Sequence, residues 1–218
     1  MAKSGGPEEE KTSAPKRRMK GPEREQMILA EAIRFFAEHG FEGQTRELAK
    51  RVGVAHSALY RHFPSKEALI ERVYEHVYVS RWNPAWRALA TDRTQPIETR
   101  LVGFYLEYIE RIFSYEWVRI FVYSGLRGFN IAGRYLDIVR REFVLPICQE
   151  MRADPNDPRP ISEREEEAVW GLHGQIFYLA IRRFVYGSPT PADLEPIVRD
   201  HVARFVRGHM ALDRCGPT

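Results

Sequence analysis

Residues 44–66 read QTRELAKRVGVAHSALYRHFPSK, and this stretch decides the fold of the N-terminal part of the chain. It holds two short segments with apolar residues on one face, which meet at Gly53 and Val54. Neither segment is expected to be stable alone, because isolated helices below about 12 residues are marginal in water. Two such helices joined at a glycine are typical of a helix-turn-helix, whose second helix enters the DNA major groove. We therefore predict a DNA-binding unit here.

A further helix is predicted just before this stretch, over residues 23–39. Its apolar residues recur at three- and four-residue spacing: Ile28, Leu29, Ala32, Ile33 and Phe36. Pro22 suits the first turn, and Gly40 can take the left-handed conformation that ends helices. This helix supplies the apolar face that the two shorter helices need.

The order of these elements resembles a known family. A helix, Gly40-Phe41, a short loop, TRELAKRVGV and then ALYRHFPSKEAL look like the DNA-binding domain of TetR-family transcriptional regulators, over roughly residues 23–71. The match is specific, because a generic helix-turn-helix does not require LY, HF and SKE after the hinge. The resemblance implies an all-α protein, with a three-helix DNA-binding domain over residues 22–66 and a larger helical effector-binding and dimerisation domain over residues 67–214.

The resemblance also implies which residues contact double-stranded operator DNA. Arg46 matches a position that reaches a base edge in some family members, where a guanidinium can bind guanine through two hydrogen bonds. Lys66 matches the family's phosphate-anchoring lysine, and His62 either faces the DNA backbone or packs under it. The candidate set is Thr45, Arg46, His56, Ser57, Ala58, Tyr60, Arg61, His62 and Lys66.

Two helix starts depart from the family's pattern. Gln44 stands where Thr or Ser would cap the second helix, and Ala55 replaces the usual Ser before the third. We expect Thr45 to take over the cap of the second helix. The departures concern the caps and the base contacts, not the fold.

Basic residues are concentrated at the N-terminal end of the chain. Residues 1–66 hold 13 Lys and Arg against 9 Asp and Glu, whereas the remainder holds 20 against 21. Residues 1–21 have almost no large apolar residue, which predicts a disordered basic arm. Arg17 and Arg18 are candidates for contacts with the minor groove or with phosphates. The equally weighted alternative is a solubilising tail.

The rest of the chain is predicted to be a helical domain. Apolar spacing predicts helices over residues 66–80, 97–114, 116–129, 131–151, 162–186 and 190–212, with a short helix near Trp82 and Trp86. Ser162 and Glu165 form a capping box, whereas Pro146 and Pro196 are expected to kink their helices. The helix over residues 97–114 is apolar nearly all round, so we place it in the interior.

Aromatic residues gather on helices that should surround one interior. One interpretation is a pocket for a flat or lipophilic effector, and the other is an aromatic core without a cavity. The family resemblance favours the pocket. The candidate effector-binding residues are Phe104, Tyr105, Tyr108, Trp117, Phe121, Tyr123, Phe129, Trp170, His173 and Phe177.

The helix over residues 162–186 has two apolar faces, and its Gly171 and Gly174 allow another helix to approach closely. The resemblance implies a homodimer through the last two helices. Two-fold symmetry agrees with this, because paired half-sites on DNA require two DNA-binding units.

The sequence holds no motif for catalysis, a metal or a cofactor. The histidines form no HExxH arrangement, and Cys148 and Cys215 fit no metal or disulfide framework. No apolar run approaches the roughly 20 residues that cross a membrane, and no signal peptide is visible. We therefore expect a cytoplasmic regulator of TetR type, not an enzyme, that represses transcription until a lipophilic or aromatic effector releases it. The alternative is a helical small-molecule-binding or interaction protein whose helix-turn-helix binds DNA without sequence specificity.

Overall fold

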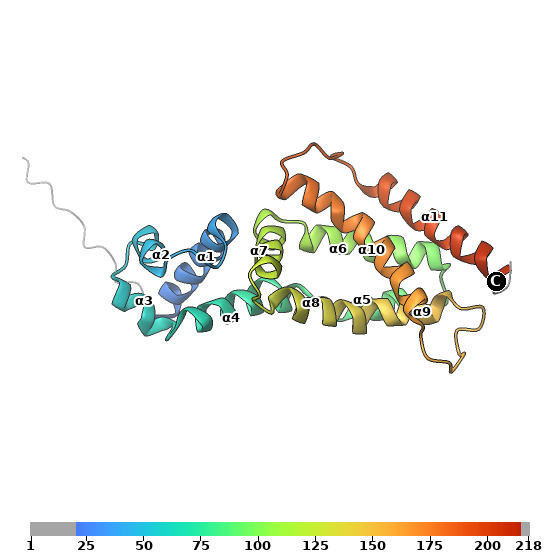
Figure 1. The fold of residues 1–218 in the computed structure, drawn as a ribbon, viewed down its shortest axis with the longest axis horizontal. Coiled ribbons are helices and arrows are strands. Elements are labelled where there is room, and N and C mark those ends of the chain that lie inside the picture. The colour runs from blue at the N-terminus through green and yellow to red at the C-terminus, as the bar shows by residue number, and fades with distance from the viewer. Residues whose placement is uncertain (1–20, 215–218) are drawn as a thin grey trace, which may run out of the picture.

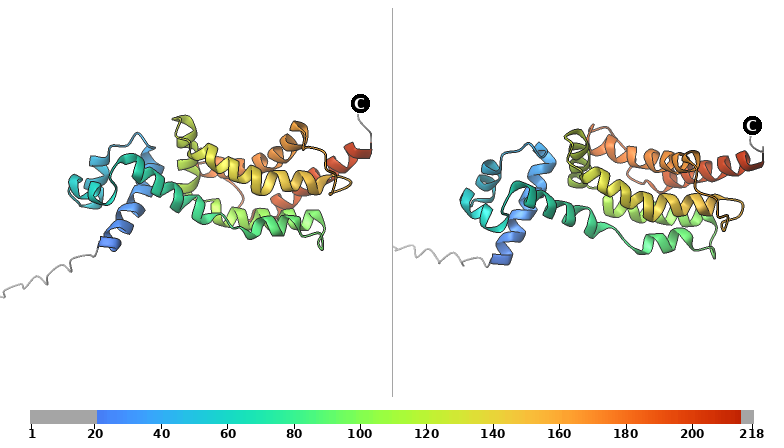
Figure 2. Two further views of the ribbon diagram at one scale, coloured as in Figure 1. Left: turned by 90° about the horizontal axis from the view of Figure 1, so that it is seen from below. Right: turned by 60° about the horizontal axis from the view of Figure 1, so that its bottom comes forward.

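The computed structural model describes residues 21–214, and the side chains among them up to His209. Residues 1–20, with Arg17 and Arg18 of the predicted arm, lie outside the described range. The described residues contain helices and no strand, which confirms the all-α prediction. Figure 1 shows an elongated molecule with a three-helix unit at one end and a helical bundle at the other, and Figure 2 gives two further views.

The three-helix unit consists of α1 (Gly21–His39), α2 (Thr45–Val52) and α3 (His56–His62), as predicted. Its two turns depend on glycine. Gly40 ends α1 with φ +67° and Gly53 ends α2 with φ +75°, a conformation that other residues rarely adopt. Leu48 and Leu59 are fully buried, together with most of the apolar face of α1. The α2–turn–α3 hairpin therefore has the shape of a helix-turn-helix.

The cap predicted at Thr45 is wrong. Gln44 is the residue before α2 and makes no capping hydrogen bond through its side chain, while Thr45 already lies inside the helix. The Thr45 hydroxyl is held elsewhere, by two residues of α3 described below. By contrast, α4 (Lys66–Val77) is capped well, since the Ser65 hydroxyl accepts a 3.0 Å hydrogen bond from the Ala68 amide.

The helical bundle follows α4. A short 3-10 turn (Val79–Arg81) leads to α5 (Ala85–Thr91), which begins after Pro84 and buries Trp86. The inner helix is α6 (Ile97–Ile112), which packs against both α5 and α11 (Glu195–Arg214). The remaining helices are α7 (Tyr115–Leu126), α8 (Ile131–Val139), α9 (Leu145–Met151) and α10 (Glu163–Phe184). The capping box of Ser162 and Glu165 starts α10 as predicted.

Two prolines lie within helical paths that continue past them. Pro196 is the second residue of α11 and does not interrupt it, because the first turn of a helix needs no donor at that position. Residues 131–151 form one continuous helical path, and a π-helical turn (Arg140–Val144) joins α8 to α9 directly before Pro146. The wide turn accommodates the missing proline amide.

Candidate DNA-binding surface and effector cavity

Three of the predicted DNA-binding residues form one cluster between α2 and α3. The Thr45 hydroxyl lies 3.0 Å from His56 Nε2 and 3.0 Å from the Tyr60 hydroxyl. The His56 and Tyr60 rings meet edge to face, with 4.9 Å between their centroids. This cluster fixes the start of α3 relative to α2, which an uncapped seven-residue helix could not achieve alone.

The other candidates differ in exposure. Arg46, Ser57 and Arg61 are exposed, and Lys66 is half-buried as the first residue of α4. His62 is also half-buried. Ala58 is only 6% exposed, so its methyl group packs inside the unit and is poorly placed to contact DNA.

The basic side chains of this end of the molecule fall into two groups. Arg34, Arg51 and Arg72 each form ion pairs with glutamates of α1 or α4. Arg46, Arg61 and Lys66 form no ion pair within residues 21–214. Positive charge without an internal partner is therefore present on α2, on α3 and at the start of α4, where it is available to phosphates.

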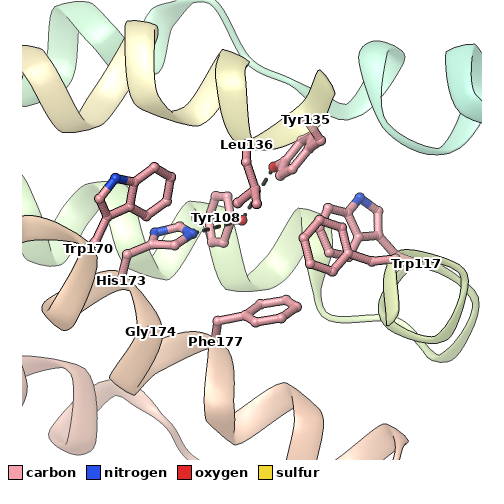
Figure 3. A pocket seen from close by; sticks show the side chains of 9 residues that line it. Tyr108, Trp117, Tyr135, Leu136, Trp170, His173, Gly174 and Phe177 are labelled. Atoms are coloured by element: carbon pink, nitrogen blue, oxygen red, sulfur yellow. Dashed lines mark hydrogen bonds between the residues drawn. The ribbon is translucent and has the colours of Figure 1, made fainter. Parts of the chain in front are cut away.

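A cavity of about 180 Å³ lies inside the bundle, between α6, α7, α8 and α10. Figure 3 shows how the side chains of these helices converge on it. Its wall consists of Tyr108, Trp117, Phe121, Tyr135, Leu136, Trp170, His173, Gly174 and Phe177. The cavity thus brings together six of the ten aromatic and histidine candidates. Tyr135, Leu136 and Gly174 were not among them.

The other four candidates lie elsewhere. Phe104 stacks on Phe143 of the π turn at 3.7 Å between ring centroids, and Tyr105 packs edge to face against the same ring. Tyr123 and Phe129 lie against the three-helix unit. The Tyr123 ring touches Gly40, and the Phe129 ring lies 4.9 Å from that of Phe41. These four residues build the core and the junction rather than the cavity wall.

The polar groups of the cavity form a short chain. The Tyr135 hydroxyl donates to the Tyr108 hydroxyl at 3.3 Å, and the Tyr108 hydroxyl lies at hydrogen-bond distance, 3.5 Å, from His173 Nε2. Burial lowers the pKa of His173 to about 4, so the imidazole is neutral near pH 7. Burial also raises the pKa of Tyr108 and Tyr135. No charged side chain therefore lines the cavity.

Two contacts connect the cavity wall to the three-helix unit. On α7, which carries Trp117 and Phe121, Arg119 Nε donates to the Ala37 carbonyl at the end of α1 at 2.7 Å. At the end of α4, the Tyr78 hydroxyl donates to the Trp117 carbonyl at 3.0 Å. These two hydrogen bonds join the cavity wall to both α1 and α4.

A helix-turn-helix with unpaired positive charge, joined to a helical bundle with an apolar cavity, is the architecture of a DNA-binding regulator. Residues 28–73 match the family described as "Bacterial regulatory proteins, tetR family". Over these residues the chain carries the DNA-binding domain of this family, as the sequence led us to expect. No group of three or more potential metal ligands occurs among the described residues, and none of their helices is long and apolar enough to cross a membrane.

Individual relatives are similar to this chain over different lengths. A nucleoid occlusion factor SlmA from Haemophilus influenzae is 46% identical over 57 residues, which cover 25% of this chain and 26% of that protein. The chain thus spans about a quarter of the length of the first curated relatives that it matches. The transcriptional repressor KstR2 from Mycolicibacterium smegmatis is 26% identical over 178 residues, 76% of this chain and 82% of that protein. A TetR-like regulator from a Rhodococcus species shares the fold, with a TM-score of 0.64 at 16% identity, over 88% of this chain and 100% of that one.

Proposed function

We propose that this protein is a homodimeric repressor that binds operator DNA through α3 and leaves it when a small apolar effector occupies the cavity. The observation that carries the proposal is the unpaired positive charge of Arg46 on α2, Arg61 on α3 and Lys66 at the start of α4. The repressor KstR2, similar over most of both chains, supports repression as the outcome of DNA binding.

The proposed DNA contacts follow from position and charge. Arg46 and Ser57 are exposed near the start of α2 and α3, where they can reach base edges. Arg61 and Lys66 are suited to phosphates, and Lys66 also lies at the positive N-terminal end of α4. Tyr60 has a positioning role in addition, since its hydroxyl holds Thr45.

Release is proposed to run through the two contacts between the cavity wall and the three-helix unit. An effector that fits the cavity only when α7 shifts would stabilise the shifted state by its differential affinity. Arg119 and Tyr78 would carry this shift to α1 and α4, and so change the spacing of the two three-helix units in the dimer. Tyr178 on the outer face of α10 is 54% exposed, as expected for a residue that a second copy covers.

Operator binding by Arg46→Ala and Tyr60→Phe tests this proposal. The operator is first selected from random duplexes with the wild-type protein, and affinities are then measured by fluorescence anisotropy at fixed salt. Losing a good bidentate base contact costs about 1–3 kcal/mol, so Arg46→Ala should weaken specific binding roughly 5- to 150-fold. Tyr60→Phe should weaken it less, because the ring remains.

The matched control is Arg34→Ala, which removes an exposed arginine of α1 that is already paired with Glu31. It should bind like the wild type, and all three variants should sediment as dimers. Equal affinity of the Arg46 variant and the control would refute the contact assignment. If selection yields no preferred sequence and affinity falls only with salt, the helix-turn-helix binds DNA without sequence specificity.

A further inference from the structure

We propose that the cavity admits uncharged molecules about the size of one or two aromatic rings, through a mouth between α8 and α10 bordered by Leu136 and Gly174. This inference rests on the proposed effector role of the cavity. It adds the chemical class of the effector and its route of entry.

Exposure of the wall residues locates the mouth. Of the nine residues that line the cavity, seven are buried or half-buried, and only Leu136 and Gly174 are exposed. The Leu136 side chain is 39% exposed, although it also lines the apolar cavity. It belongs to α8 and Gly174 to α10, and the two helices diverge toward α7 (Figure 1). We therefore place the opening of the cavity beside these two residues.

Gly174 lies on the flank of α10 between the cavity and the outer surface. Its neighbours His173 and Phe177 line the cavity (Figure 3). Gln175 and Tyr178 are exposed. A Cβ atom built on Gly174 would meet nothing within 4 Å. A larger side chain here would thus occupy the mouth without forcing the backbone to move, which makes this glycine a determinant of access.

An ion pair holds α10 against the π turn on the side of the mouth away from α7. Arg140 of the π turn donates to Glu166 of α10, with 2.8 Å between Nη2 and Oε2. Glu166 in turn accepts a 3.3 Å hydrogen bond from Trp170 Nε1, so the same carboxylate holds a wall residue in place. This contact fixes α10 against the π turn. The opening is consequently confined to the stretch beside Leu136 and Gly174.

The chemistry of the wall selects the class of ligand. A charged group in the cavity would lose its hydration without gaining a counter-ion, because no wall residue is charged and His173 is neutral. An apolar cavity of about 150 Å³ binds benzene, so about 180 Å³ accommodates one ring with a substituent or a compact pair of rings. Trp117, Phe121 and Phe177 offer edges and faces to such a ring.

The test uses nitrobenzene as a neutral probe that quenches tryptophan fluorescence, and benzoate as a charged molecule of nearly the same shape. Trp117 and Trp170 lie in the wall, so entry is followed as a saturable loss of fluorescence in a stopped-flow instrument. Saturable quenching by nitrobenzene and no competition by benzoate are expected. Competition by benzoate at equal concentration would overturn the assignment of an uncharged ligand.

Variants at the mouth test the route. Gly174→Leu should slow association about tenfold, equivalent to a barrier higher by 1.4 kcal/mol, and Leu136→Ala should speed association and dissociation together. The matched controls are Gly171→Leu, one turn earlier on α10 with equally open space and no place in the wall, and Leu126→Ala, which is 74% exposed at the end of α7. If a larger side chain on α10 affects dimerisation, both glycine variants should show the effect, which sedimentation measures.

Equal association rates for Gly174→Leu and Gly171→Leu, with Leu136→Ala like the wild type, would overturn the route. Absence of saturable quenching in the wild-type protein would overturn the whole inference. Operator affinity is measured on the same samples without probe. Intact operator binding together with a failed probe assay would leave the DNA-binding half of the proposed function standing, whereas loss of both would reject the two proposals together.

Discussion

Replacing Arg119 by methionine should loosen the junction between the bundle and the three-helix unit. The Arg119 guanidinium donates to the Ala37 carbonyl at 2.7 Å and to the Tyr123 hydroxyl at 2.8 Å, and it lies 5.0 Å from the centre of the Tyr115 ring. Methionine keeps most of the apolar stem but removes the charge and the donors. The Ala37 carbonyl belongs to the last turn of α1, where carbonyls lack helical partners and a cation is favourable.

The expected cost follows from these contacts. A hydrogen bond to a charged group contributes about 1.5–3 kcal/mol, so the free energy of unfolding should fall by about 2 kcal/mol, a factor of about 30 in the folding equilibrium. Urea unfolding followed by circular dichroism measures the loss, and hydrogen exchange should show lower protection at the Gly40 amide, which bonds to the Phe36 carbonyl. The control is Arg127→Met at the exposed end of α7, where little change is expected. Equal stability and equal protection in the two variants would refute the role given to Arg119.

Two further predictions concern single positions. Gly40→Ala should destabilise the protein by about 1–3 kcal/mol, because φ is +67° and the new methyl group would press on the Tyr123 ring. Gly171→Ala lies in a helix with open space around it and should instead stabilise the protein by up to about 1 kcal/mol. Thermal unfolding of both variants checks the direction of each change. For His173, the pKa falls from 6.5 in the unfolded chain to about 4 in the folded protein, so the unfolded state binds the proton first and stability drops as the pH decreases from about 6.5 to 4. His173→Phe should remove this part of the pH dependence, on the order of 3 kcal/mol. Urea unfolding at pH 7 and 4.5 measures it, and an equal loss of stability between these pH values in the wild type and the variant would contradict the prediction.

The sequence predicted those parts of the fold that depend on local chemistry. Gly40, Gly53 and the capping box of Ser162 and Glu165 act where they were expected, because a left-handed turn or a capped first turn is determined by a few adjacent residues. The failures also have local causes. Thr45 looked like a cap because of its residue type, yet its hydroxyl is used by His56 and Tyr60, which are 11 and 15 residues away.

The cavity was predicted only in part, because periodicity identifies a buried face but not the element on which that face packs. Tyr123 and Phe129 lie on or just after α7 and are apolar enough for an interior, yet they contact Gly40 and Phe41 of the three-helix unit. Tyr135 had the spacing of an inward residue and proved to be a wall residue. Gly174 has no side chain to reveal its place, so only the three-dimensional arrangement could assign it to the mouth.

The π turn explains a regularity in the sequence of α8 and α9. One row of buried residues along this path is spaced by four: Ile131, Tyr135, Val139, Phe143, Ile147 and Met151; Val144 and Cys148 are buried beside it. On a regular α-helix, a step of four residues rotates by about 40° beyond a full turn, so such a row would wind away from the core. The wide turn holds one more residue than an α turn and rotates the row back. Deleting a single residue within 140–144 would therefore leave both helices intact while turning the inward face of one of them toward solvent.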